Sequence, residues 1–359
     1  MEAGRSPRQK KAAARHRAAM AKALEIPGFD PNASLDECIS LLLKARTGDI
    51  ESFRQGLYEK TVAAVHDMRV SCRRLQTVLM LFEDSIKKNL FKKFNKNLRA
   101  LIKRLGKARQ FDVVMETIVP HIHAHNENQK TALNLYLAHY RAKRFTAMQK
   151  ALKAFREFRA DPLYKRFISP AHDVRLMVTA KKSRRDKNPG FPLTMREFIS
   201  KLLKDFLSGA EGALINADDP AALHAMRIRG KPLRFAMEQA QPFLKKPFGA
   251  HYLEIKTMIE ELGFIHDNDV ACLALRRFDK ELYFFNAATT ENRLPRTMLI
   301  NARKNLEIER QNHLEKVRGT LMNWRARHFP ETVSDLLAHA RWRRKAAQEN
   351  NLTKAINFE

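Results

Sequence analysis

The chain has 359 residues, of which 44% are hydrophobic, so it can bury a sizeable core, and its formal net charge is +28. No apolar run approaches the ~18 residues that a membrane span requires, and the three cysteines include no CxxC pair that would indicate a zinc site. A protein this basic repels itself unless an acidic partner neutralises it, so the composition favours binding to a polyanion: nucleic acid, an acidic membrane surface or polyphosphate.

Helices are predicted along nearly the whole first half. After a basic arm at residues 1–30, apolar residues at helical spacing predict helices at about 34–58, 62–86, 89–105, 110–125 and 127–158. Gly106 is expected to end the third helix, and Pro120 is expected to kink the fourth. No stretch alternates convincingly between apolar and polar residues, so strands are not predicted.

The middle of the chain differs from the rest. Prolines and a charge run at 161–191 predict a linker or an irregular crossover. Helices are then predicted at about 193–215, 220–242, 248–262, 267–285 and 296–328, followed by a short C-terminal helix and a polar tail. The expected organisation is a first bundle at 31–160, a second bundle at 192–330 and the C-terminal helix and tail at 331–359.

Two segments of the chain repeat each other. The sequence AAVHDMRVSCRRLQTVLMLF at 63–82 returns as AALHAMRIRGKPLRFAMEQA at 221–240. Further on, LGKARQFDV in the first half matches LGFIHDNDV in the second. The repeat predicts an internal duplication of a helical unit of about 150 residues. The expected fold is therefore all-α, with two antiparallel helical bundles related by a pseudo-twofold axis.

Each repeat carries a line of cations on one face of a helix. In the second copy the four residues fall within about 80° of one another: His224, Arg227, Lys231 and Arg234. In the first copy His66, Arg69 and Arg73 share a face, and Gln76 takes the fourth position. Met68, Leu75 and Leu79 occupy nearly the opposite side. We refer to these cationic lines as the first stripe (His66, Arg69, Arg73) and the second stripe (His224, Arg227, Lys231, Arg234).

The composition of the stripes favours anion binding over a solvated face. A merely solvated face ordinarily mixes in Glu and Asp as i, i+4 partners, and the stripes contain none. Arginine suits phosphate because its planar fork donates two hydrogen bonds at once. The two histidines have three readings: they donate to phosphate, titrate near neutral pH, or pack at the helix edge.

The helix after the first stripe adds four cations at one azimuth: Lys92, Lys96, Arg99 and Lys103. Its counterpart in the second half is weaker, because Lys256 matches Arg99 but Glu260 matches Lys103. Asp112 and Asp269, in the repeated Leu-Gly…Asp-Val segments, have two readings. Each either caps the start of the next helix or orients a nearby arginine or histidine.

The doubled His-x-x-Arg motif, with its following basic residues and downstream Leu-Gly…Asp-Val, resembles the CHAD family (conserved histidine α-helical domain) over about residues 30–330. The resemblance implies two similar helical bundles with basic faces that bind inorganic polyphosphate, and association with polyphosphate granules. Carried over by position, the implied contacts are His66, Arg69, Arg73, Arg74, His224, Arg227, Lys231 and Arg234. Additional contacts are expected from the long helices, at Arg141, Arg144, Arg303 and Arg310.

The sequence departs from the family pattern at three positions. Gln76 stands where arginine is usual, Pro232 stands opposite Arg74, and Gln110 replaces an acidic residue that the second half keeps as Asp267. No triphosphate-tunnel signature is present, because EIERQ at 307–311 lacks the lysine and falls in a predicted helix. The expectation is a stand-alone binding protein.

The leading hypothesis is a cytoplasmic, non-enzymatic polyphosphate-binding protein at polyphosphate granules, without a cofactor or metal. The alternative is sequence-nonspecific RNA or DNA binding, against which the stripes lack the aromatics that stack on bases. A polyphosphate-processing enzyme is the third reading, although the stripes lack the carboxylates that hold metal in phosphoryl transfer. The sequence HIHAH at 121–125 places two histidines at i, i+4. They have two readings: a pair that binds a metal, or side chains at a solvated helix end.

Overall fold

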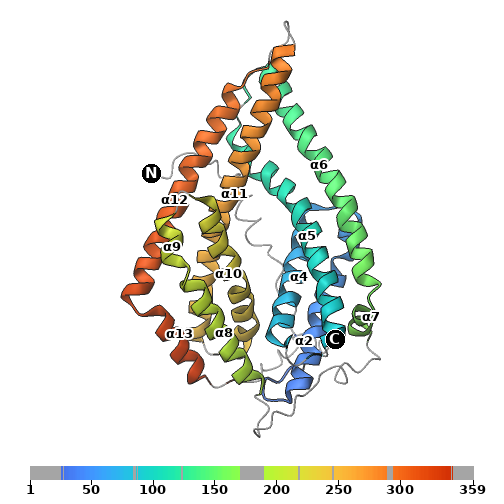
Figure 1. Cartoon of the computed structure of the whole chain (residues 1–359), viewed down its shortest axis with the longest axis vertical. Coiled ribbons are helices and arrows are strands. Elements are labelled where there is room, and N and C mark those ends of the chain that lie inside the picture. Colours follow the sequence, from blue (N-terminus) through green and yellow to red (C-terminus); the bar gives the residue numbers. More distant parts are fainter. Residues whose placement is uncertain are drawn as a thin grey trace, which may run out of the picture. The chain divides into compact units, whose positions relative to one another are not determined.

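The computed structural model describes residue 26 and residues 28–83, 86, 88–122, 124–169, 190–216, 219–244, 246–288, 294–340 and 342. Within these ranges the regular structure is entirely helical, as predicted, and contains no strand (Figure 1). The basic arm lies mostly outside the described residues, as do 170–189 of the predicted linker and 343–359 of the tail. The chain divides into two compact units, which are described separately.

Unit 1 comprises the described parts of residues 43–174 and 264–312. It contains the C-terminal part of α2 (Leu35–Ser52), five complete α-helices and parts of two long ones, α11 (Lys246–Ala288) and α12 (Thr297–Ala326). The complete α-helices are α3 (Arg54–Tyr58), α4 (Val62–Leu81), α5 (Lys88–Ile118), α6 (Glu127–Arg159) and, at the start of the predicted linker, α7 (Pro162–Ile168). Helix α5, which carries the predicted cationic row, packs against α4, which carries the first stripe, and against α6.

The core of unit 1 joins α5 and α6 to the later helices. Tyr136 and Tyr140 of α6 lie against each other, and the Tyr136 ring meets Phe278 of α11 edge-on at 5.0 Å. The Tyr140 hydroxyl donates to the Ala274 carbonyl at 3.3 Å, so its polar group is satisfied inside the core. A second aromatic cluster, Phe94 with Phe158 and Phe167, holds α5 to α6 and α7.

Unit 2 comprises the described parts of residues 25–42, 175–263 and 313–359. Its complete α-helices are α8 (Phe191–Leu207), α9 (Ala210–Ile215), α10 (Pro220–Ala240) and α13 (Phe329–Ala338). Helix α10 packs on α8 and α9, and α13 packs on α8. The Trp324 ring stacks on Phe329 at 4.3 Å, and its Nε1 donates to Glu254 at 3.0 Å. These contacts fix the turn between α12 and α13.

Helix α10 approaches its neighbours closely at Gly230. A Cβ at this position would lie 2.9 Å from Phe206 Cε2 on α8 and 2.9 Å from Ile259 Cγ1 on α11. Both neighbouring side chains belong to the core, so neither is free to move aside. Glycine at 230 therefore sets how closely the helix that carries the second stripe approaches α8 and α11.

Several predicted helix ends are wrong. Helix α5 continues through Gly106, and α11 continues through 263–266, where separate helices were expected. One glycine costs a helix only about 1 kcal/mol, and burial of the neighbouring Leu105 and Ala108 outweighs that cost. Pro120 does not kink a helix either, because α5 ends at Ile118 and a 3-10 turn follows at Val119–His121. Pro232, in contrast, lies inside a continuous α10.

Candidate anion-binding stripes

The first stripe lies on α4 at the boundary between core and solvent. Thr61 caps the helix, since its hydroxyl accepts a hydrogen bond from the Ala64 amide at 3.2 Å. Met68, Leu75 and Leu79 are buried, as the sequence predicts. His66, Arg69 and Arg73 are half-buried, so α4 directs its apolar face inward and holds the cations at the edge of the packed surface.

The second stripe repeats this arrangement on α10. Asp219 takes the place of Thr61 and accepts from the Ala221 amide at 2.9 Å. Leu223, Met226 and Leu233 are buried, whereas His224, Arg227 and Lys231 are half-buried. The corresponding cap, apolar face and cation positions give the repeated sequence a repeated local structure.

The first arginine of each stripe lies against a glycine of the next long helix. A Cβ at Gly106 on α5 would be 3.6 Å from Arg69 Nε. In unit 2, a Cβ at Gly263 on α11 would be 3.5 Å from Arg227 Nε. The glycine of the repeated Leu-Gly segment thus leaves room for a guanidinium. Sequence reasoning missed this role because it took Gly106 as a helix stop, although the repeated glycine itself was a visible signal.

Within the second stripe, Arg227 and Lys231 act on the charge state of His224. The pKa of His224 is lowered, first by burial and then by the positive charges of Arg227 and Lys231. Those charges disfavour the imidazolium form because they lie close to the ring. A bound anion would relieve part of this repulsion.

Two arginines of the motif lie deeper than the rest. Arg74 is 2% exposed and Arg234 is 7% exposed. Arg234 Nη1 lies 3.8 Å from Glu260, and Arg73 Nη1 donates to Gln76 at 2.9 Å. Arg74 is therefore packed inside unit 1 and does not line the accessible part of the first stripe. Gln76, which occupies the position that corresponds to Arg234, supports Arg73 through this hydrogen bond.

Helix α5 presents the predicted cationic row to solvent. Lys92, Lys96, Arg99 and Lys103 are all exposed, as their common azimuth predicts. Lys256, the counterpart of Arg99 on α11, is half-buried. The exposed lysines and arginine therefore give α5 a row of accessible positive charges.

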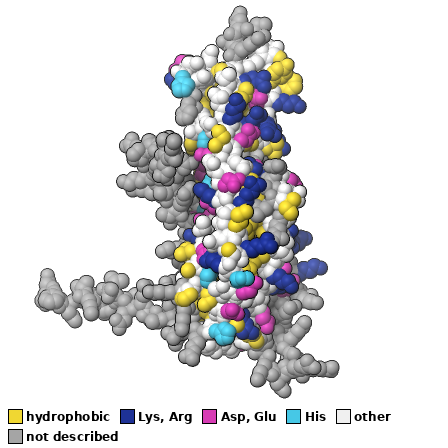
Figure 2. Space-filling view, turned by 90° about the vertical axis from the view of Figure 1, so that its left-hand side faces the viewer, with side chains coloured by type: hydrophobic (Ala, Val, Ile, Leu, Met, Phe, Trp, Pro, Cys, Tyr) yellow, Lys and Arg dark blue, Asp and Glu magenta, His cyan; other side chains and the backbone are white. Residues whose placement is uncertain are grey.

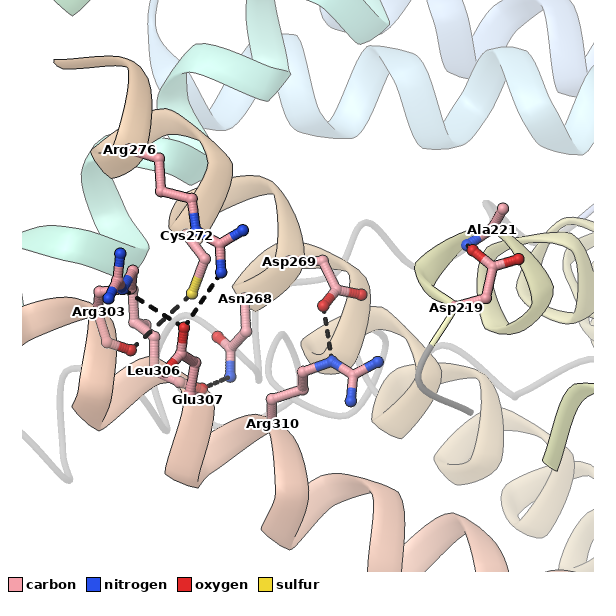
Figure 3. Close-up of polar contacts among 10 residues, drawn as sticks. All are labelled: Asp219, Ala221, Asn268, Asp269, Cys272, Arg276, Arg303, Leu306, Glu307 and Arg310. Atoms are coloured by element: carbon pink, nitrogen blue, oxygen red, sulfur yellow. Dashed lines mark hydrogen bonds and ion pairs between the residues drawn. The ribbon is translucent and has the colours of Figure 1, made fainter. Parts of the chain in front are cut away.

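The arginines expected as additional contacts fall into two groups. Arg144 of α6 donates from Nε to the buried carboxylate of Asp112 on α5, and from Nη2 to the Lys60 carbonyl at 2.9 Å. Arg310 of α12 donates from Nε to Asp269 of α11 at 2.6 Å (Figure 3). Arg303 lies 3.5 Å from Glu307, and Arg141 is exposed. Two of the four are thus held by the aspartates of the repeated Asp-Val.

These pairs decide between the two readings of the aspartates. Both lie inside long helices, so capping is wrong and orientation of an arginine is confirmed. Burial raises the pKa of Asp112 and of Asp269, and the paired arginine opposes the shift in each case. Through the Lys60 carbonyl, Arg144 also ties the turn before α4 to α5 and α6.

A mixed-charge face offers a contrast. Figure 2 shows Lys and Arg interspersed with Asp and Glu on the side of the molecule where α12 lies. On α12 itself, Arg318 donates to Glu315 at 2.8 Å, and Lys316 lies 4.0 Å from Glu261 of α11. This is the pattern of an ordinary solvated helix, whereas the residues that make up the two stripes are all basic or histidine.

The described residues give little support for a metal site, a membrane span or a reactive cysteine. They contain no group of three or more side chains suited to holding a metal. His121 Nε2 lies 3.5 Å from Glu309 and His125 is exposed. No described helix has the length and apolar character of a membrane span. The three cysteines are buried and form no disulfide, and burial raises the pKa of Cys272 to about 11, which leaves it a poor nucleophile.

Comparison with known proteins gives a consistent picture. The chain is similar in structure to the crystal structure of the CHAD domain from the plant Ricinus communis, with a TM-score of 0.62 and 22% identity over 85% of this chain and 96% of that one. It also resembles PptA from Streptomyces chartreusis, with a TM-score of 0.56 and 16% identity over 81% of this chain and 99% of that one. No curated protein matches by sequence. The CHAD domain family model matches residues 33–276, and the chain therefore belongs to the CHAD family.

Proposed function

We propose that the protein binds inorganic polyphosphate through the two stripes and the cationic row of α5, without catalysis, and associates with polyphosphate granules in the cytoplasm. The observation that carries this proposal is a contact found in both repeats, in which an arginine lies against a glycine of the next long helix. Arg69 lies against Gly106, and Arg227 lies against Gly263. Packing holds each guanidinium in place, so less side-chain entropy is lost when it binds a phosphate.

The spacing of the cations suits a flexible, repeating anion. Residues three and four apart on a helix have Cβ atoms about 5–6 Å apart, so successive phosphates of one chain can meet successive donors. Polyphosphate has no bases, and the stripes contain no aromatic residue on which a base would stack. The stripes also contain no carboxylate that would hold a catalytic metal, which supports binding in preference to turnover.

A competition assay distinguishes polyphosphate binding from nonspecific binding of nucleic acid. Fluorescently labelled long-chain polyphosphate is bound to the full chain at two salt concentrations and challenged with unlabelled RNA at matched phosphate. The proposal expects RNA to compete at least tenfold less well than unlabelled polyphosphate, with affinity for both falling as salt rises. Equal competition by RNA would mean that the surface binds any polyanion, and release of orthophosphate during the assay would contradict a binding-only role.

A further inference from the structure

The turn between α3 and α4 has a lysine in a backbone conformation that usually requires glycine. Lys60 has a φ of 60°, in the left-handed region where a side chain crowds the backbone. Among the described residues, His328 is the one other non-glycine residue with a positive φ. Such strain persists only where contacts, or a use of the side chain, offset it.

The backbone of this turn forms a Schellman motif, a common ending of a helix. The Lys60 amide donates to the Leu57 carbonyl at 3.1 Å, and the Thr61 amide donates to the Gly56 carbonyl at 3.0 Å. In this motif the left-handed position is usually occupied by glycine. A glycine there would keep both hydrogen bonds and remove the strain, so the backbone alone does not explain a lysine.

Arg144 of α6 holds the same turn. Its Nη2 donates to the Lys60 carbonyl at 2.9 Å, and its Nε donates to the buried carboxylate of Asp112 on α5. Asp112 lies six residues after Gly106, roughly 9 Å along the axis of α5, and Gly106 is the residue against which Arg69 lies. Lys60 is therefore held near the same helix that places the first arginine of the first stripe.

The ammonium group of Lys60 lies against an exposed aromatic ring. Its Nζ is 5.1 Å from the centroid of the Phe145 ring, and Phe145 is 58% exposed. A cation–π contact at an exposed ring is weak, so the ammonium can leave the ring for a phosphate. The neighbouring acids already have partners, since Glu59 accepts from Gln55 Nε2 at 2.8 Å and Asp112 accepts from Arg144.

We propose that Lys60 is a further polyphosphate-binding residue, placed by this turn at the start of the helix that carries the first stripe. The inference rests on the proposed function. The first stripe has three members and the second has four, because Gln76 takes the fourth position, and Lys60 adds a cation at the opposite end of α4. A flexible anion bound at His66 reaches the turn by extending six residues, roughly 9 Å along α4.

Glycine substitutions separate strain from binding. Lys60→Gly relieves the strain, so the protein should unfold at the same or a higher temperature. Its affinity for labelled polyphosphate should nevertheless fall about threefold, and the salt dependence should become shallower by about one charge. His328→Gly is the matched control, since it relieves the same strain in unit 2 and should leave the affinity unchanged. A Lys60→Gly protein that binds as tightly as the His328→Gly protein overturns the inference.

Charge-matched variants exclude a general effect of net charge. Lys60→Gln and Lys143→Gln each remove one lysine that lies over an aromatic ring, since Lys143 Nζ is 5.5 Å from the centroid of Tyr140. Lys60→Gln should lose about threefold in affinity, and Lys143→Gln should lose much less. Lysine acylation with and without polyphosphate, read by mass spectrometry, should show protection of Lys60 but not of Lys143. A purely structural role of the turn would not produce this protection.

The outcomes distinguish this inference from the proposed function. If Lys60→Gln and Lys143→Gln bind equally and Lys60 is not protected, while Arg69→Gln/Arg73→Gln weakens binding, only the role of Lys60 is overturned. If the unmodified chain does not prefer polyphosphate to RNA in the competition assay, the proposed function itself fails, and the role of Lys60 fails with it.

Discussion

Arg69 Nε lies 3.6 Å from the point where a Cβ on Gly106 would stand, and Arg227 has the same relationship to Gly263 at 3.5 Å. These are ordinary contact distances, so a methyl group fits beside each guanidinium. We expect a longer side chain at either glycine to extend into the space that the guanidinium occupies. The repeated Leu-Gly segment therefore controls where the first arginine of each stripe lies.

Changes at Gly106 should separate helix stability from binding. Gly106→Ala should stabilise the protein by about 0.5–1 kcal/mol, because alanine is the better helix former, and should leave polyphosphate affinity unchanged. Gly106→Leu should lower the affinity several-fold by displacing the Arg69 guanidinium. Thermal unfolding and titration with labelled polyphosphate measure the two effects. If the leucine variant is folded and binds as tightly as the alanine variant, the position of Arg69 does not matter to binding.

Binding should take up protons at His224. In the free protein its pKa is lowered by burial and by the neighbouring cations, and a bound polyanion offsets the repulsion from those cations. The pKa is then higher in the complex than in the free protein, so affinity should rise as pH falls from about 8 to about 5.5. Calorimetry in buffers of different ionisation enthalpy gives the proton uptake. His224→Gln should flatten the pH dependence, and an unchanged slope would assign the titration to another group.

The buried pair of Asp112 and Arg144 should contribute far more to stability than an exposed pair. Asp112 is 1% exposed, and its removal leaves Arg144 without its main counter-charge, so Asp112→Ala should destabilise the fold by about 2–4 kcal/mol. The matched control is Asp279→Ala, which breaks the more exposed pair with Arg296 and should cost about 1 kcal/mol or less. Urea unfolding measures both variants, and equal losses would show that burial of the carboxylate is unimportant.

Gly230→Ala should destabilise the protein by about 1–3 kcal/mol, because the new methyl group would lie 2.9 Å from Phe206 and from Ile259. Gly212→Ala is the matched control, since no atom lies within 4 Å of its Cβ position, and it should be neutral or slightly stabilising. Thermal unfolding of the two variants distinguishes them. A stable Gly230→Ala protein would mean that α10 can move away from α8 and α11.

The helices and the stripes were predictable because both follow from the period of the α-helix. Apolar positions such as Met68 and Leu75 mark the buried face of α4, and the register of Arg69 and Arg73 follows from them. The helix end predicted at Gly106 was wrong, since propensity at one residue competes with burial along the whole helix. The kink predicted at Pro120 was wrong because α5 ends before it, at Ile118.

The parts of the site that depend on tertiary packing were not predictable in the same way. Arg74 lies one residue from the half-buried Arg73, yet it is almost completely buried, and only the placement of neighbouring helices decides this. The partner of Asp112 is 32 residues away in sequence. The sequence left two readings of the aspartate, capping of a helix or orientation of a nearby arginine or histidine, and it could not select Arg144 from the many basic residues of α6.

The central claim is that the positioned cations of the stripes, and not the net charge alone, bind polyphosphate. The most direct measurement compares two variants that lose the same charge: Arg69→Gln/Arg73→Gln/Arg227→Gln in the stripes, and Lys304→Gln/Lys316→Gln/Arg325→Gln on α12, each titrated with labelled polyphosphate at two salt concentrations. The stripe variant should lose at least tenfold in affinity and show a shallower salt dependence, whereas the α12 variant should lose about threefold or less. Equal losses would contradict the claim and reduce the stripes to part of a uniformly basic surface.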